Sequence, residues 1–150
     1  MAHSLSKLYV HLIFSTKYRL PLLLDSFRSR FHDYLGGILR ELEVPAIEMN
    51  SEPDHVHILF VQSRTMCLAE IVQEVKRSSS IWLKKVDSSL ENFYWQKGYG
   101  AFSVSESFLE QIQIYIRNQR EHHRKISYQE EYRDWLHQYR IEYDERYVWE

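Results

Sequence analysis

The sequence contains a single cysteine, Cys67, among its 150 residues. One cysteine cannot form an intramolecular disulfide, and it cannot build a zinc site from several thiolates. No apolar run approaches the roughly 20 residues of a membrane span, and the first residues lack the basic flank and apolar stretch of a signal peptide. These absences predict a protein of the reducing cytoplasm.

A strong basic excess is also missing, because the formal net charge is -2. General polyanion binders usually carry such an excess. The deficit is local, however: residues 1–127 carry 16 Lys and Arg against 14 Asp and Glu, whereas residues 128–150 carry 3 against 7. The length fits one domain, so we predict a single unit over residues 1–150 with an acidic helical tail from about residue 128.

Apolar periodicity and turn residues predict the elements of this unit. The expected strands cover residues 9–14, 44–49, 55–61 and 98–104. The expected helices cover residues 25–41, 68–85, 107–125 and 127–139, and the last two begin at capping boxes, Ser107 with Glu110 and Ser127 with Glu130. This order predicts an α+β fold of the split βαβ (ferredoxin-like) type, an antiparallel sheet with helices on one face plus C-terminal helices.

Two histidines open the third predicted strand, at His55 and His57. Residues two apart in a strand point to the same face, roughly 6.5–7 Å apart, which is workable spacing for chelating a metal. A lone His-x-His also occurs where each ring simply hydrogen-bonds at a sheet edge. Two histidines are too few for a catalytic metal, which needs a third protein ligand.

The helix expected over residues 107–125 carries Tyr115 and Gln119 four residues apart, on one face, with His122 one turn later. A Gln carboxamide oxygen suits Mg²⁺ or Mn²⁺, and a cation there would lie beside the Tyr115 phenol. A phenol with a pKa near 10 is a poor nucleophile at neutral pH, so the cation would matter. The alternative is that Tyr115 is a packing residue among the isoleucines of this helix.

Several cations and aromatic residues are candidates for contact with nucleic acid, although solvated helix faces and core positions would give the same pattern. The candidate phosphate contacts are Lys17, Arg19, Lys76, Arg77, Arg117 and Arg120, with Arg124 and Lys125 on the same helix as the last two. The candidate stacking residues for unpaired bases are Tyr18, Trp95 and Tyr99.

Four segments together resemble one family. They are Y-V-H-L-I-F-S-T-K-Y-R at residues 9–19, D-H-V-H-I-L-F at 54–60, W-Q-K-G-Y-G-A-F-S-V-S at 95–105 and Y-I-R-N-Q-R-E-H-H at 115–123. The chain is similar over residues 9–125 to the single-tyrosine transposases of the HUH (His-hydrophobe-His) nucleases, encoded by the smallest prokaryotic insertion sequences and called IS200-like.

The resemblance implies a metal-dependent transposase that cuts and rejoins single-stranded DNA at hairpins marking the ends of a mobile element. Tyr115 would form a 5′-phosphotyrosine and release a 3′-hydroxyl, while His55, His57 and Gln119 would hold Mg²⁺ or Mn²⁺. The family acts as a homodimer, in which the tyrosine helix of one subunit can serve the histidines of the other. Asp54 could orient a histidine ring, although a turn-forming Asp is the other interpretation, and His122 is a further neighbour of the site.

Two other functions remain open. A related HUH nuclease could nick DNA without transposing it, and a domesticated descendant could bind hairpin DNA without catalysis. A purely structural role for the histidines predicts DNA binding that is indifferent to metal and to Tyr115→Phe. A phosphoesterase with paired His-x-Thr or His-x-Ser motifs is excluded, because the sequence has only one His-x-His and neither partner motif.

Overall fold

The structure, a computed structural model that describes residues 3–150, is built on an antiparallel sheet of four strands in the order β2-β3-β1-β4. The strands are β1 (Tyr9–Ser15), β2 (Ala46–Glu52), β3 (His55–Val61) and β4 (Gly100–Val104). The predicted strands are all present, and β3 has the predicted bounds. Within residues 3–150, no helix combines the length and the apolar character needed to cross a bilayer.

The strand that carries the histidine pair lies in the interior of the sheet, between β2 and β1. Its side chains are buried from His55 to Phe60. Val56, Ile58 and Phe60 face one apolar core, whereas the histidines and Leu59 face the other side. The strand is therefore central in the sheet and buried on both faces.

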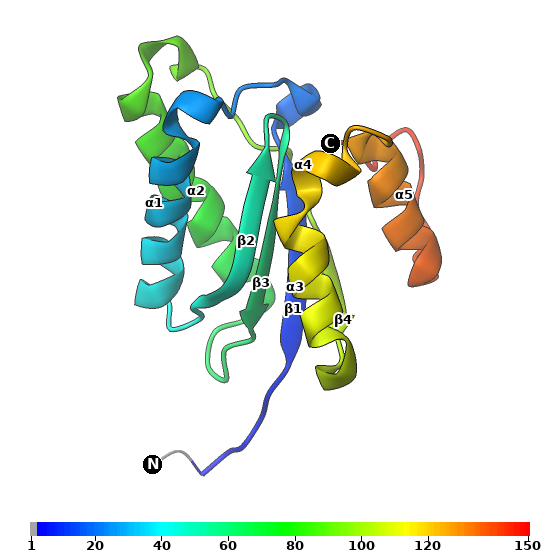
Figure 1. The fold of residues 1–150 in the computed structure, drawn as a ribbon. Coiled ribbons are helices and arrows are strands. Elements are labelled where there is room, and N and C mark those ends of the chain that lie inside the picture. The colour runs from blue at the N-terminus through cyan, green and yellow to red at the C-terminus, as the bar shows by residue number, and fades with distance from the viewer. Residues whose placement is uncertain (1–2) are drawn as a thin grey trace.

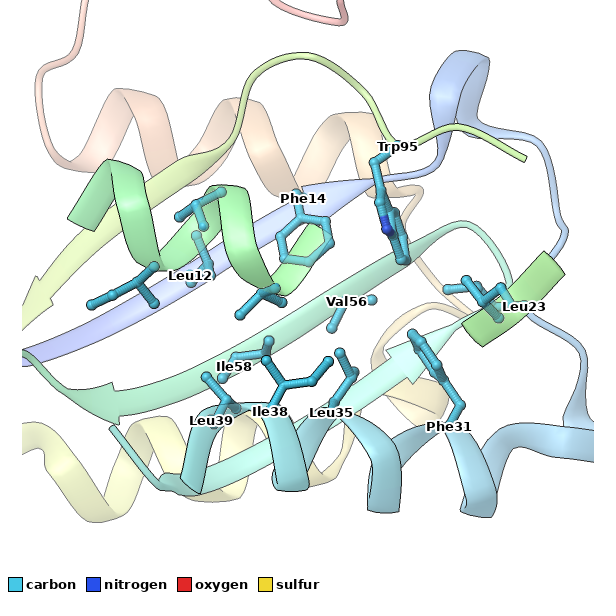
Figure 2. Packing of buried hydrophobic residues seen from close by; sticks show 14 of the residues in the cluster. Leu12, Phe14, Leu23, Phe31, Leu35, Ile38, Leu39, Val56, Ile58 and Trp95 are labelled. Carbon is cyan, nitrogen blue, oxygen red and sulfur yellow. The ribbon is translucent and has the colours of Figure 1, made fainter. Parts of the chain in front are cut away.

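Helices α1 (Arg28–Glu41) and α2 (Leu68–Val86) cover one face of the sheet (Figure 1). Their apolar stripes meet β1 and β3 in the larger core, where Phe31 and Leu35 of α1 lie opposite Val56 (Figure 2). The helix predicted over residues 25–41 starts with a 3-10 turn at Asp25–Phe27, and α1 itself begins at Arg28.

The C-terminal helices cover the opposite face (Figure 1). They are α3 (Leu109–Arg117), α4 (Gln119–His122) and α5 (Tyr128–Gln138). Ile116 of α3 packs on Leu59, and α5 packs on Ile13 and Phe102 through its aromatic residues. The α+β prediction is thus confirmed, with α1 and α2 on one face and the C-terminal helices on the other.

The prediction of one helix over residues 107–125 is wrong, because the chain breaks at Asn118, whose φ is -97° and ψ is 23°. The Asn50 side chain on β2 donates hydrogen bonds to the carbonyls of Ile116 (2.9 Å) and Arg117 (3.1 Å). These bonds satisfy carbonyls that a continuous helix would have paired internally, so α3 can end there.

The two predicted capping boxes have different outcomes. Residues Glu106–Phe108 wind as a 3-10 turn, and the start of α3 has no side-chain cap. At the start of α5, by contrast, the Ser127 hydroxyl accepts a hydrogen bond from the Glu130 amide at 3.2 Å. This cap fixes where α5 begins and therefore which of its residues face the sheet.

Candidate functional site

The two predicted metal-binding histidines lie side by side on the face of β3 that the C-terminal helices cover. Their ring centroids are 5.1 Å apart, and both side chains are buried. The Asp54 carboxylate lies 2.6 Å from His55 Nδ1, which leaves the Nε2 atom of His55 directed toward the cluster. Asp54 thus lies in the turn before β3 and also contacts the His55 ring, so its position fits both roles that the sequence suggested.

A third histidine, His11 on β1, was not predicted. Its Nε2 lies 2.9 Å from His57 Nδ1, and the two rings are stacked. Burial lowers the pKa of both His11 and His57, so the uncharged rings are favoured. His11 therefore fixes the orientation of His57 and leaves His57 Nε2 free to face the cluster. A histidine in the middle of an otherwise apolar strand was the signal in the sequence.

The helix break brings Gln119 into the cluster. Gln119 is fully buried at the start of α4, and its Nε2 donates to the Tyr115 carbonyl at 3.2 Å. Its Oε1 lies 3.5 Å from His55 Nε2 and 2.8 Å from His123 Nε2. The structure therefore places Gln119 beside the histidine pair, together with a fourth histidine, His123, which no sequence pattern indicated.

A buried carboxylate, Glu131 of α5, lies at the centre of these groups. Its Oε1 is 3.1 Å from His57 Nε2 and 3.7 Å from His55 Nε2. Its Oε2 is 3.2 Å from His123 Nε2 and accepts a hydrogen bond from the Tyr115 hydroxyl. Glu131 thus connects the histidine pair to the tyrosine within a single chain.

Tyr115 is held by further contacts from two helices. Trp135 Nε1 donates to the Tyr115 hydroxyl oxygen at 3.3 Å, and His122 Nε2 lies 3.3 Å from the same oxygen. A small pocket of about 160 Å³ reaches Tyr115 between His122 and Trp135. The interpretation of Tyr115 as a packing residue is incomplete, because its hydroxyl lies in a polar cluster that this pocket reaches.

The charges in the cluster depend on burial and on the carboxylate. Burial alone would raise the pKa of Glu131, but His57, His123 and His55 lower it well below its ordinary value. Burial and the neighbouring Glu131 charge raise the pKa of Tyr115. Glu131 is therefore ionised and Tyr115 is protonated, so attack by Tyr115 requires a group that accepts its proton.

The donor atoms of this cluster fit a divalent cation. One ligand atom each from His55, His57, His123 and Glu131 all lie within 4.8 Å of one another. Imidazole nitrogens together with a carboxylate and a carboxamide oxygen make a mixed set, which suits Mn²⁺ better than the oxygen-preferring Mg²⁺. The chemistry of the residues therefore agrees with the expected metal site.

The predicted phosphate contacts separate into two groups. Four of them have protein partners: Lys76 donates to the carbonyls of residues 96 and 98, and Arg77, Arg117 and Arg120 pair with Glu74, Glu48 and Asp25. Lys17 and Arg19 have no carboxylate at ion-pair distance among residues 3–150, and both lie in the turn after β1.

The three predicted stacking residues differ in how far they are exposed. Tyr18 is 70% exposed, whereas Trp95 is 8% exposed and donates its indole N–H to the Ser79 hydroxyl at 3.0 Å. Tyr99 packs against the larger core. Trp95 is therefore a core residue, which is one of the two alternatives that the sequence left open.

Comparisons with known proteins agree with one another. The family described as "Transposase IS200 like" matches residues 4–119. The ISDra2 transposase TnpA of Deinococcus radiodurans is 29% identical over 118 residues, which are 75% of this chain and 84% of that protein.

Two solved structures are similar in fold. The first is a crystal structure of a candidate transposase from Deinococcus radiodurans R1, with a TM-score of 0.64 and 27% identity over 79% of this chain and 95% of that one. The second is a REP-associated tyrosine transposase bound to a REP hairpin, with a TM-score of 0.61 and 13% identity over 82% of this chain and 72% of that one.

Proposed function

Because this chain belongs to the IS200-like transposase family, we propose that it cuts and rejoins single-stranded DNA at hairpin-marked ends, with Tyr115 as the nucleophile. The observation that carries the proposal is the contact chain from Tyr115 through Glu131 to His57. A phenol beside a cluster of metal-ligating groups is the arrangement that this chemistry needs. The similar fold of a transposase bound to a hairpin supports hairpin DNA as the substrate.

In the proposed reaction, the Tyr115 oxygen attacks a backbone phosphorus of the DNA. The bond from this phosphorus to the 3′ oxygen breaks, so the 5′ phosphate becomes joined to Tyr115. Glu131, which already accepts the hydrogen bond of the phenol, takes its proton, and the departing 3′ oxygen takes a proton from water. Rejoining is the reverse reaction with a different 3′-hydroxyl.

The proposed ligands of a divalent cation are His55, His57 and Gln119, with His123 and Glu131 as further donors within reach. When bound, the cation would polarise the scissile phosphate and offset the charge that develops on it. His11 would hold the His57 ring in place through its Nδ1 atom. The native cation is proposed to be Mn²⁺ or Mg²⁺, and the mixed donors favour Mn²⁺.

These contacts also indicate whether one subunit or two supply the catalytic groups. The resemblance implied a homodimer in which the tyrosine helix of one subunit can serve the histidines of the other. Here Tyr115, Glu131 and His57 of one chain are in contact. We therefore propose that one subunit contains a complete set of catalytic groups, and dimer formation stays a prediction.

The test is formation of a covalent adduct between the protein and a single-stranded hairpin DNA with Mn²⁺ or Mg²⁺ present, detected on a denaturing gel. Tyr115→Phe should abolish the adduct because it removes the attacking oxygen, whereas the exposed Tyr147→Phe should leave it unchanged. His57→Ala should remove cleavage but keep hairpin binding.

Two results would contradict the proposal. If Tyr115→Phe still forms the adduct, another residue is the nucleophile. If the wild-type protein binds hairpin DNA equally with and without metal and never forms an adduct, the chain is a hairpin-binding protein without catalysis.

A further inference from the structure

A second pocket, of about 390 Å³, lies between the turn that follows β1 and the C-terminal segment. Figure 1 shows these two parts of the chain side by side at one end of the sheet. The pocket is lined by four cationic side chains, two aromatic ones and one carboxylate, namely Lys17, Arg19, Lys97, Arg146, Tyr18, Trp149 and Glu150.

The turn that forms one wall has an unusual backbone. Tyr18 and Arg19 are consecutive residues in the left-handed region, with φ values of 60° and 57°. Such conformations are costly for residues other than glycine, and they concentrate at functional sites. The Thr16 hydroxyl holds the turn by donating to the Leu20 carbonyl at 2.7 Å. The result is that the Tyr18 ring stands largely in solvent beside the pocket.

The cations of the pocket are available for an anion. Within residues 3–150, no carboxylate lies at ion-pair distance from Lys17, Arg19 or Lys97, while Arg146 pairs only with Asp144 in its own turn. The Arg19 guanidinium lies over the Trp149 ring at 5.4 Å, and Lys17 Nζ lies 5.4 Å from the Tyr18 ring. Cations next to exposed aromatic faces are typical of sites that take a phosphate and an unpaired base together.

The pocket is close to the candidate active site. The Thr16 amide, one residue before the turn, donates to the Asp54 carbonyl at 2.9 Å, next to His55. On the other wall, the Tyr128 ring stacks on His55 at 4.6 Å and contacts the Trp149 ring at 6.4 Å. One aromatic ring therefore separates the pocket from the histidine cluster, so a single DNA strand could reach both.

We propose that this pocket binds an unpaired nucleotide of the single strand that flanks the hairpin. The base stacks on Tyr18, and the adjoining phosphates contact Lys17, Arg19 and Lys97. The proposal rests on the proposed function, and in it Trp149 of the C-terminal segment holds the Arg19 guanidinium against the face of its ring. The pocket holds the flanking strand while its scissile phosphate lies at Tyr115.

The test is fluorescence anisotropy with the full chain in EDTA, which prevents cleavage. Three labelled DNAs are compared: a hairpin, the same hairpin with a short oligothymidine extension on either side, and oligothymidine alone. We expect the extension to tighten binding to the wild-type protein. Tyr18→Ala should reduce this gain in affinity by about fivefold or more. Arg19→Ala should reduce both the gain in affinity and its dependence on salt.

Matched controls are Tyr143→Ala, which removes an exposed tyrosine from the same C-terminal segment, and Lys85→Ala on α2. Both should retain the gain. The proposal is overturned if the extension adds no affinity, or if Tyr18→Ala and Arg19→Ala lose no more than the controls. Either result is compatible with hairpin binding and a Tyr115 adduct, so the proposed function would survive it.

If the hairpin itself does not bind and no adduct forms, the proposed function fails. The proposed pocket is then tested by the binding of oligothymidine alone. Weaker binding by Tyr18→Ala than by the wild-type protein supports the pocket, and equal affinity overturns it.

Discussion

A single side chain, Glu131, joins the two halves of the candidate site. One carboxylate oxygen faces His57, and the other accepts the hydrogen bond of Tyr115. Because its pKa lies well below the ordinary value, Glu131 is an ionised acceptor at neutral pH. In the proposed reaction Glu131 takes the proton of the phenol because it already accepts the hydrogen bond of Tyr115, while its low pKa keeps it ionised and makes it a weak base.

Glu131→Gln keeps the size of the side chain but removes its ability to take that proton. We expect the rate of adduct formation to fall about 10²–10⁴-fold, the usual contribution of a positioned base. Glu130→Gln, which changes the exposed neighbour, should be silent. The measurement is single-turnover adduct formation with thermal unfolding as a check on the fold, and an unchanged or faster rate would contradict the assignment.

His11 acts on the metal site through His57. Its Nε2 is the hydrogen-bond partner of His57 Nδ1, and no other partner of His57 Nδ1 is found among residues 3–150. His11→Leu should therefore weaken Mn²⁺ binding about 10–100-fold, as loss of such outer partners commonly does. His11→Gln, which retains a hydrogen-bonding group, should restore part of the affinity.

Isothermal titration calorimetry with Mn²⁺ checks this expectation. His32→Leu is the matched control, because His32 on α1 bonds to the Ser51 hydroxyl and does not contact the cluster. Equal Mn²⁺ affinity of His11→Leu and the wild-type protein would show that His11 does not position His57.

Local spacing predicted some of the site residues and not others. His55 and His57 lie two apart in one strand, and Tyr115 and Gln119 lie four apart, so each pair could be recognised from the sequence. Glu131 could not, because 74 residues separate it from His57 and its neighbours read as an ordinary acidic tail. Only the packing of α5 on the sheet brings Glu131 to the histidines.

The position of α5 depends on a close approach to β4 at Gly100. A Cβ atom at Gly100 would lie 2.6 Å from the Tyr132 ring and 3.0 Å from the Phe102 ring. Gly100→Ala should therefore force Tyr132 outward and destabilise the protein by about 1–3 kcal/mol, the usual cost of overpacking. Since Tyr132 is on the same helix as Glu131, the change should also loosen the site.

Hydrogen exchange and thermal unfolding test this expectation together. Residues 128–138 should exchange faster in Gly100→Ala than in the wild-type protein. Gly37→Ala is the control, because its added Cβ would only meet Arg40 Nη2 at 3.8 Å within a helix, where alanine is the better residue. The account of α5 docking is wrong if Gly100→Ala unfolds and exchanges like the wild-type protein.

Some features of the secondary structure could be predicted from sequence patterns alone, and others could not. The apolar run in residues 55–61, interrupted only by the histidines, gave β3 its bounds, because a strand that is buried on both faces is apolar along its whole length. The break at Asn118 was missed because the pattern of α3 continues through it. Its cause is a contact with Asn50, a residue on another element that no local pattern contains.

The fold brings the candidate catalytic residues together from three separate parts of the sequence. β3 supplies the histidine pair, the α3–α4 junction supplies Tyr115, Gln119 and His123, and α5 supplies Glu131. The match to IS200-like transposases covers residues 4–119, which include the histidine pair, Tyr115 and Gln119, whereas His123 and Glu131 lie beyond the matched range. Helix α5 therefore contributes to a candidate site that the family match covers only in part.

In the proposed reaction Tyr115 becomes covalently joined to DNA. The most direct measurement is tandem mass spectrometry of the adduct after digestion with nuclease and protease. If Tyr115 is the nucleophile, a 5′-linked nucleotide is expected on Tyr115 and on none of the other tyrosines in the chain, and only when divalent metal was present. A nucleotide on a different residue, or an adduct that forms equally in EDTA, would contradict it.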